Sequence, residues 1–352
     1  MTQKITIAID AMGGDRGAEI AVPGCAMALQ RHPDAQFIFF GNAEAIRPLL
    51  LKHKTLSAKA EIRNAEISIA MDEKPSQALR RGRYKSGMWQ AIDAVRQGQA
   101  AAVVSAGNTG ALMAMSRFIL RTLPGIGRPA IAAIYPTLKG ECIVLDVGAT
   151  VGADAHQLVE FAIMGEAMAS CLFGKPQPSV GLLNIGVEEV KGNDSVKEAA
   201  RMLRALKLPL HYDGFVEGDD IGQGRVDVVV TEGFTGNVAI KVAEGTVKQM
   251  TSFLRSALRA TLISKIGAFL AGGAFAALRE RLDPSKHNGG VFLGLNGVVV
   301  KSHGSTDVLG YATAVEVAIE MVRNGLTQRI AHDVAEVHNV LQAPMPIEDA
   351  AE

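Results

Sequence analysis

The chain has 352 residues, of which 48% are hydrophobic and 20% are charged, a composition typical of a soluble globular protein. Acidic and basic residues balance at 36 each, so the net charge gives no reason to expect nucleic acid, and any charged partner must bind a local patch. The chain is long for one compact core, which favours two lobes that share one sheet. We therefore expect one unit over residues 1–342 and a flexible tail over 343–352.

Three cysteines, Cys25, Cys142 and Cys171, have neither paired nor Cys-x-x-Cys spacing, and we interpret them as small core residues. No charged segment followed by an apolar signal core is visible at the N-terminus, which predicts a cytoplasmic protein. The longest uncharged apolar stretch in the later half, 266–278, has about 13 residues, whereas roughly 20 are needed to span a bilayer. We expect no transmembrane helix.

Strand-like apolar runs alternate with helix-period segments along most of the chain. This alternation predicts an α/β fold with a layered, mostly parallel sheet. The runs at 130–135 and 141–146 are separated by a hairpin-length segment, so we expect an antiparallel pair at the edge of the sheet or at the joint between lobes. The predicted strands are 4–10, 36–41, 100–105, 130–135, 141–146, 179–185, 226–231 and 298–302.

Several of these runs stop at loops of Gly, Asn, Ser, Thr and Asp, and a helix-like stretch follows each loop. The clearest examples are 10–15, 105–111 and 233–237. Open α/β sheets bind ligands at the carboxyl ends of their strands, and small residues let backbone N–H groups approach an anion closely. The loops therefore predict a site for a phosphate-like group.

Residues 71–89 form a basic segment whose charges fit a solvated helix face and contact with an anion equally well. Its basic side chains are Lys74, Arg80, Arg81, Arg83 and Lys85.

Residues 246–282 depart from the α/β pattern. Apolar residues recur every four positions from Leu254 to Leu270, and basic residues occur without an acid before Glu280. This spacing predicts a basic amphipathic helix, which can lie in a membrane interface or bind an acidic partner, although packing against its own core or a second subunit is the commoner outcome. Glycines at 267, 272 and 273 favour two short helices joined at a mobile tip, within a protruding segment of about 246–285.

Taken together, five loops resemble those of the bacterial phosphate acyltransferase family. They span residues 10–15, 105–111, 183–192, 233–237 and 301–304, and the resemblance covers residues 4–340. It implies transfer of a long-chain acyl group from the thioester of acyl carrier protein to inorganic phosphate. The acyl phosphate then passes to a membrane acyltransferase that acylates glycerol 3-phosphate. The resemblance also implies a homodimer, peripheral contact with the inner face of the cell membrane, and an α/β fold related to phosphotransacetylase and to isocitrate and isopropylmalate dehydrogenases.

Three positions depart from the family pattern. Thr150 stands where the family has Asn, so an amide role there cannot be assumed. Val187 replaces a Glu, which excludes an essential carboxylate at that position. Glu232 replaces an Asp and adds one methylene, which matters if that carboxylate contacts substrate.

The implied reaction needs no activated Ser or Cys, because phosphate is already an anionic nucleophile and has only to be held in line with the thioester carbon. Amide side chains can position substrates and stabilise an oxyanion, and lysines can balance the phosphate charge. His303 is a candidate acid for the leaving thiolate, with a purely structural role in its loop as the alternative. The candidate catalytic residues are Asn108, Asn184, Lys191, Asn237 and His303. The expected phosphate or substrate contacts are Gly13, Gly14, Asp15, Ser105, Gly107, Thr109, Thr235, Gly236, Lys301 and Ser302.

We expect no metal, because the eight histidines are scattered. No cofactor is expected, because the glycines at 181–186 and 222–224 lack the strand–GxGxxG–helix context of a dinucleotide site. Two other functions stay open: a short-chain phosphotransacetylase that uses acyl-CoA, and a non-catalytic membrane-associated scaffold for lipid synthesis. The residues expected to contact the carrier or the membrane are Arg255, Arg259, Leu262, Lys265, Ile266 and Phe269.

Overall fold

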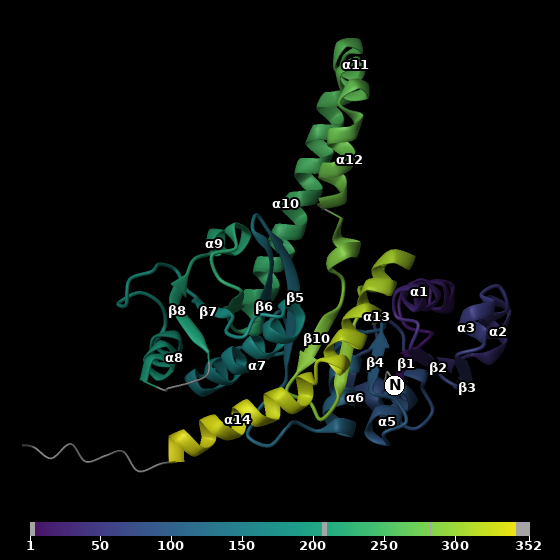
Figure 1. Cartoon of the computed structure of the whole chain (residues 1–352), viewed down its shortest axis with the longest axis horizontal. Helices are drawn as coiled ribbons and strands as arrows, with labels where there is room; N and C mark the ends of the chain where they lie inside the picture. The colour runs from purple at the N-terminus through teal and green to yellow at the C-terminus, as the bar shows by residue number, and fades with distance from the viewer. Residues whose placement is uncertain (1–3, 206–209, 282, 343–352) are drawn as a thin grey trace, which may run out of the picture.

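The computed structural model describes residues 4–205, 210–281 and 283–342, so the predicted tail at 343–352 lies outside the described residues. One 11-stranded sheet runs through the molecule in the order β3-β2-β1-β4-β11-β10-β5-β6-β9-β7-β8 (Figure 1). Its strands are β1 Ile5–Asp10, β2 Ala35–Gly41, β3 Ala60–Asn64, β4 Ala102–Ser105, β5 Ala130–Thr137, β6 Gly140–Leu145, β7 Ser179–Leu183, β8 His211–Val216, β9 Val228–Val230, β10 Gly290–Leu293 and β11 Val298–Lys301.

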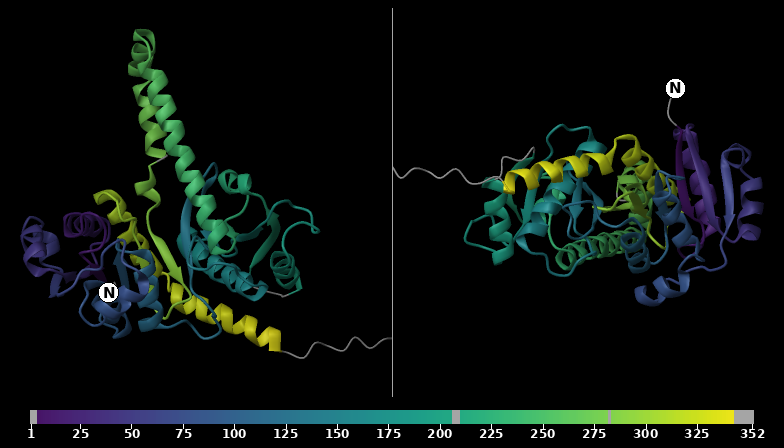
Figure 2. Two further views of the ribbon diagram at one scale, coloured as in Figure 1. Left: turned by 180° about the vertical axis from the view of Figure 1, so that it is seen from behind. Right: turned by 90° about the horizontal axis from the view of Figure 1, so that it is seen from below.

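Helices lie on both faces of this sheet (Figure 2). They are α1 Ala18–Arg31, α2 Ala43–Leu51, α3 Lys54–Ser57, α4 Pro75–Gly82, α5 Gly87–Arg96, α6 Thr109–Leu120, α7 Ala155–Phe173, α8 Asp194–Ala205, α9 Gly218–Gln223, α10 Gly233–Arg259, α11 Leu262–Leu270, α12 Gly272–Arg281, α13 Val308–Arg323 and α14 Leu326–Gln342, with a 3₁₀ helix, η1, at Pro284–His287. The predicted α/β fold is confirmed.

The sheet separates two apolar cores, because alternate residues of a strand point to opposite faces. Ile7 and Ile9 of β1 pack into the core that includes α1, α7 and α13. Ala8, between them, packs on the other face with Trp89 and Ile92 of α5. Burial on both faces explains why the central strands are continuous apolar runs.

The β5–β6 pair is antiparallel, as predicted, with Thr137 opposite Gly140. It does not lie at an edge, because β5 also pairs with β10 and β6 also pairs with β9. The pair joins two parallel sets of strands, β3-β2-β1-β4-β11 and β6-β9-β7-β8. Of the two positions that the sequence left open, the edge is wrong, and the pair lies instead between the two parallel sets.

The strand register across this pair places the carboxyl ends of β11 and β6 in nearly the same row of the sheet. Lys301 pairs with Gly290 of β10. The next β10 residue, Val291, pairs with Ala132 of β5, which pairs with Leu145 of β6. The two sets run in opposite directions, yet β11 and β6 end within a residue or so of the same row. The loops that follow these strands therefore start close to the centre of the sheet.

A helical hairpin, residues 246–281, projects from the body of the molecule (Figure 1). It comprises the end of α10, then α11, then α12, with α11 farthest from the sheet. The sequence predicted two short helices, and α11 and α12 are short, but the hairpin also contains the end of the long helix α10, which begins at Gly233. The predicted four-residue stripe is interrupted, because the Thr261 hydroxyl caps a new helix by accepting a hydrogen bond from the Ser264 N–H (3.1 Å).

The three cysteines are buried free thiols, which confirms their prediction as core residues. Among the described helices, none combines the length and apolar character that a membrane span requires.

Candidate functional site

Strands β1, β4 and β11 end side by side at Asp10, Ser105 and Lys301. The buried Asp10 carboxylate accepts a hydrogen bond from the Ser105 hydroxyl (2.7 Å), which in turn accepts one from the Gly107 N–H (3.0 Å). Burial raises the pKa of Asp10, while the bond from Ser105 and the charge of Lys301 oppose that rise. Asp10 and Ser105 thus hold the start of the loop at 105–111 in place through hydrogen bonds.

Two glycines hold the loop after β1 against its neighbours. A Cβ on Gly13 would lie 2.5 Å from the nitrogen of Gly107, and a Cβ on Gly14 would lie 2.8 Å from the oxygen of Gly304. Gly14 also has a φ of +83°, which favours glycine. The Asp15 N–H donates to the Gly304 carbonyl (2.9 Å), so the loops at 10–15, 105–111 and 301–304 form one assembly.

Lys301 lies at the centre of this assembly. Its ammonium donates to the carbonyls of Ala106 (3.2 Å) and Ser302. Burial lowers the pKa of Lys301 to about 8, against the charges of Asp10 and Asp15, which raise it. The side chain is a partly desolvated cation, and bringing a phosphate beside it would favour its charged form.

His303 follows in the same loop. Its Nδ1 lies 3.0 Å from the Ser305 hydroxyl and 3.3 Å from the Ser305 N–H, which can only donate. Partial burial, Lys241 and Lys301 together lower the pKa of His303. A neutral imidazole with an acceptor at Nδ1 carries its proton on Nε2, so this side chain is arranged as a hydrogen-bond donor.

The second parallel set ends at another assembly, built on Asp146. Its buried carboxylate accepts hydrogen bonds from the N–H groups of Ile131 (3.0 Å), Gly148 (3.1 Å) and Ala149 (2.9 Å). Thr150 adds its N–H and its hydroxyl, both at 2.7 Å. Sequence reasoning missed Asp146, although an Asp directly after a buried strand is a signal for it. Thr150 is engaged with this carboxylate.

The start of α10 packs directly on that loop. A Cβ on Gly233 would lie 2.3 Å from the Thr150 oxygen, and a Cβ on Gly236 would lie 1.9 Å from the Asp146 oxygen. Glu232 caps the helix by accepting hydrogen bonds from the N–H groups of residues 234 and 235 (2.9 and 2.7 Å). Burial tends to raise the pKa of Glu232, but the bonds from Thr235 and neighbouring N–H groups lower it overall. The Thr235 hydroxyl also donates a hydrogen bond to the Glu232 carboxylate.

Helix α10 connects the two assemblies. Asn237 is exposed, and its side chain lies against Gly148 of the second assembly. One turn later, Lys241 is close enough to Lys301 and His303 to lower the pKa of both. Lys241 itself pairs with Glu244 (2.8 Å). The candidate site therefore comprises the loops of the first set and the face of α10 that carries Asn237 and Lys241.

Asn108 is used locally in the structure. Its carbonyl caps α6 by accepting the Ala111 N–H (3.0 Å), and its amide donates to the carbonyls of Met71 (2.8 Å) and Glu73 (2.9 Å). These bonds fix the segment before α4 next to the site. The adjoining Thr109 is exposed at the start of α6.

Asn184 and Lys191 come together after β7. The Asn184 amide donates to the Lys191 carbonyl (3.1 Å), and the Lys191 ammonium pairs with Glu188 (2.9 Å). Both follow β7 of the second parallel set. Like Thr235 and Gly236, they are candidate residues that lie with the second set and not in the loops around Lys301.

The basic segment is partly neutralised. Arg81 pairs with Glu73 (2.6 Å), and Lys85 pairs with Glu66 (3.3 Å). Arg83 lies over the rings of Tyr84 and Phe118.

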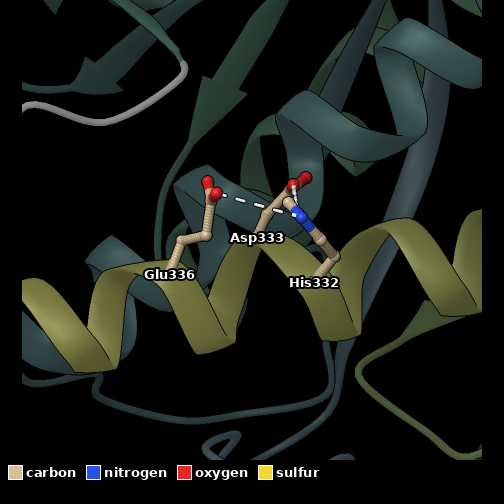
Figure 3. A group of neighbouring side chains, drawn as sticks. All are labelled: His332, Asp333 and Glu336. Atoms are coloured by element: carbon tan, nitrogen blue, oxygen red, sulfur yellow. Dashed lines mark hydrogen bonds and ion pairs between the residues drawn. The ribbon is translucent and has the colours of Figure 1, made fainter.

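Among the described residues, His332, Asp333 and Glu336 of α14 form a group of potential metal ligands (Figure 3). His332 is exposed, and its Nδ1 already lies 3.2 Å from Asp333. Arg329 lies 3.8 Å from the same carboxylate and places positive charge beside it. This arrangement is an ion-pair cluster on a helix, and we assign no metal to it.

Comparison with solved structures defines the class of the fold. The chain is similar to a EutD phosphotransacetylase from Staphylococcus aureus, with a TM-score of 0.60 and 18% identity over 91% of this chain and 94% of that one. It is similarly related to a phosphotransacetylase from Streptococcus pyogenes, with a TM-score of 0.61 and 17% identity over 91% and 94% of the two chains. The protein has a phosphotransacetylase-like α/β fold, as the sequence predicted.

Sequence comparison gives the family. Residues 5–329 match the model of a family described as "Fatty acid synthesis protein". The chain is 61% identical over 335 residues to a phosphate acyltransferase from Sinorhizobium fredii, covering 95% of this chain and 96% of the relative. It is 58% identical over 347 residues to a phosphate acyltransferase from Rhizobium rhizogenes, covering 98% and 100%. This chain belongs to the phosphate acyltransferase family, and it is an enzyme.

Proposed function

We propose that the protein transfers a long-chain acyl group from the thioester of acyl carrier protein to inorganic phosphate. The product would be an acyl phosphate, which a membrane acyltransferase would use to acylate glycerol 3-phosphate. The observation that carries this proposal is Lys301, a partly buried cation held among three glycine-rich strand-end loops. Such a site suits a small, highly charged anion, because backbone N–H groups and one lysine can surround it closely.

The side chains around Lys301 suggest how the transfer proceeds. Lys301 would hold the phosphate, and Lys241 from α10 adds a second positive charge near it. Held in line with the thioester carbon, the phosphate oxygen can attack without a protein nucleophile. Asn237, exposed on α10, and the Nε2–H of His303 are the nearest candidates to stabilise the oxyanion of the tetrahedral intermediate.

His303 suits hydrogen bonding better than proton donation. Burial and the two neighbouring lysines lower its pKa, so the imidazolium form is disfavoured near neutral pH. A bound phosphate dianion would oppose this effect. The role we propose for His303 is therefore that of a donor to the intermediate, with the thiolate leaving largely as the anion.

The helical hairpin is proposed as the contact with acyl carrier protein and the membrane surface. Leu262, Ile266 and Phe269 are 78%, 61% and 85% exposed, while Arg255, Arg259 and Lys265 lie on the same hairpin. Apolar and basic side chains together suit an anionic bilayer interface or the acidic surface of a carrier. We propose a cytoplasmic protein bound peripherally to the inner face of the membrane, a homodimer, and a single catalytic unit of two lobes.

The fold also supports a second candidate, a short-chain phosphotransacetylase that acts on acyl-CoA. The exposed apolar hairpin gives the long-chain proposal its advantage, since a soluble short-chain donor needs no such surface. A non-catalytic scaffold would have no need of the three hydrogen-bonded loops that surround Lys301.

The deciding experiment measures thiol release from palmitoyl acyl carrier protein with and without inorganic phosphate, and traps the acyl product with hydroxylamine. Phosphate-dependent release with a trapped hydroxamate is expected. Release without phosphate would indicate a thioesterase. Strong preference for acetyl-CoA over the palmitoyl carrier would establish the phosphotransacetylase instead.

A further inference from the structure

We infer that Asn288 is a positioning residue that sets the conformation of the Lys301–Gly304 loop and ties this loop to the base of the helical hairpin. The kinetic part of this inference rests on the proposed function. Asn288 was not among the residues that the sequence singled out. It lies two residues before the start of β10 and 13 residues before Lys301, in a chain that turns back through β11.

The Asn288 side chain is buried and fully used. Its two amide hydrogens face three acceptors: the Gly310 carbonyl (2.7 Å) and the Ser302 hydroxyl (2.8 Å) are the closest, and the Thr306 hydroxyl (3.2 Å) shares one of the hydrogens. Its carbonyl accepts the His303 N–H (3.0 Å). One side chain therefore bonds both residues that follow Lys301 and the first turn of α13.

These bonds fix the direction in which the loop leaves β11. The Ser302 N–H donates to the Ser105 carbonyl (2.9 Å), so the strand pairing orients the loop only as far as that residue. The next restraint is the hydrogen bond from the His303 N–H to Asn288. It positions the His303 backbone and so the point from which the imidazole side chain extends. An alanine at position 288 would leave the His303 N–H without that partner and would remove a second hydrogen bond from the Gly310 carbonyl.

Asn288 also follows the segment through which the chain returns from the helical hairpin to the sheet. Helix α12 leads through η1 to His287, whose Nδ1 lies 2.7 Å from Glu141 at the start of β6. The next residue is Asn288. Displacement of the hairpin base can therefore reach the His303 backbone through a single residue and a single hydrogen bond.

Asn296 provides a matched control on the same pair of strands. It lies in the turn between β10 and β11, at the opposite end from Asn288. Its amide donates to the carbonyls of Leu120 (3.2 Å) and Thr122 (2.8 Å), so an alanine there also removes amide hydrogen bonds that brace a loop. It touches none of the candidate site residues.

The test compares Asn288→Ala with Asn296→Ala in the full chain. Phosphate-dependent thiol release gives kcat and the KM for phosphate and for the acyl carrier, and NMR follows the titration of the His303 imidazole. For Asn288→Ala we expect the phosphate KM to rise at least tenfold, with the carrier KM within twofold and an altered His303 titration. Asn296→Ala should leave all of these values near those of the unmodified protein. Unchanged phosphate KM and an unchanged His303 titration in Asn288→Ala would overturn the inference.

The His303 titration requires no turnover, so it still decides the positioning role if the unmodified protein fails to form acyl phosphate. If Asn288→Ala does not fold, Thr306→Val decides. This nearly isosteric change removes one acceptor of the Asn288 amide. A smaller change of the His303 titration in the same direction would support the inference, and no change would overturn it.

Discussion

Helix α10 runs through two regions of the molecule that differ in how closely the helix is packed. At its start, in the body, Gly233 and Gly236 are buried against the Asp146–Thr150 loop, and no side chain would fit at either position. Toward its end, in the helical hairpin, Phe253 and Leu254 are exposed. One continuous helix is therefore closely packed against the candidate site at its start and exposes apolar side chains toward its end.

The largest effect should come from removing the charge of Lys301. Lys301→Met keeps the apolar stem and removes the ammonium that we propose binds phosphate. Loss of one preorganised electrostatic contact typically lowers the rate by about 10²–10³-fold, and we expect a loss of that order in phosphate-dependent thiol release. Lys52→Met, an exposed lysine at the end of α2, is the matched control and should keep its activity. Activity within threefold of the original in Lys301→Met would place the phosphate elsewhere.

Two glycines of α10 test the contrast along the helix itself. Gly236→Ala puts a methyl group 1.9 Å from the Asp146 carbonyl oxygen, so the helix start must shift. We expect a loss of about 1–3 kcal/mol in the free energy of unfolding, as for other overpacked sites, together with reduced activity. Gly245→Ala meets nothing within 4 Å and should stabilise the helix by up to about 1 kcal/mol. Urea denaturation of both variants measures the difference, and equal stabilities would contradict this packing.

The sequence predicted the parts of this contrast that depend on local pattern. Buried parallel strands are continuous apolar runs, and eight of them were located within a few residues. Three strands were missed: β3 and β8 are edge strands with polar residues, and β10 is a short apolar run enclosed by Gly289, Gly290 and Gly294, which resembles a loop. Edge strands need no apolar face on both sides, so their sequences resemble loops.

The candidate site was predictable only in part. Glycines at 13, 14 and 236 were identified because close backbone contact requires them, and their loops do meet other loops. Long-range partners were not predictable, since the Asp146 and Asn288 networks join segments far apart in the chain. Nor does a single sequence reveal that Asn108 caps a helix and holds residues 71 and 73.

Binding to lipid vesicles tests the proposed role of the helical hairpin. Leu262→Asp combined with Phe269→Asp replaces two apolar side chains that are 78% and 85% exposed with charges. Burying such a side chain in an apolar phase is worth about 1.5–3 kcal/mol, so binding to anionic vesicles should fall at least tenfold. The kcat at saturating acyl carrier protein should stay within about threefold, because neither side chain is part of the loops around Lys301, whereas the KM for the carrier should rise.

A control adds the same charges to the body, as Leu51→Asp with Leu138→Asp, and should bind vesicles normally. Sedimentation with vesicles measures binding, and light scattering measures the oligomeric state. Intact vesicle binding combined with a change of oligomeric state in the hairpin variant would make this surface a subunit contact.

The smallest effect should be on the pH dependence of stability, and it comes from Glu166 in the body of the molecule, where α7 packs against α14. Glu166 is buried beside Arg329 (3.2 Å) and near Asp333, and burial raises its pKa to about 7 although Arg329 opposes the rise. The folded state therefore binds more protons than the unfolded state between about pH 4.5 and 7. Stability conferred by the protonated carboxyl is complete below the unfolded pKa and is lost as the pH rises through about 7. In Glu166→Gln this part of the pH dependence should disappear, whereas hairpin variants should retain it. Thermal unfolding across pH 5–8 provides the measurement, and parallel curves for Glu166→Gln and the original chain would show that Glu166 stays ionised throughout.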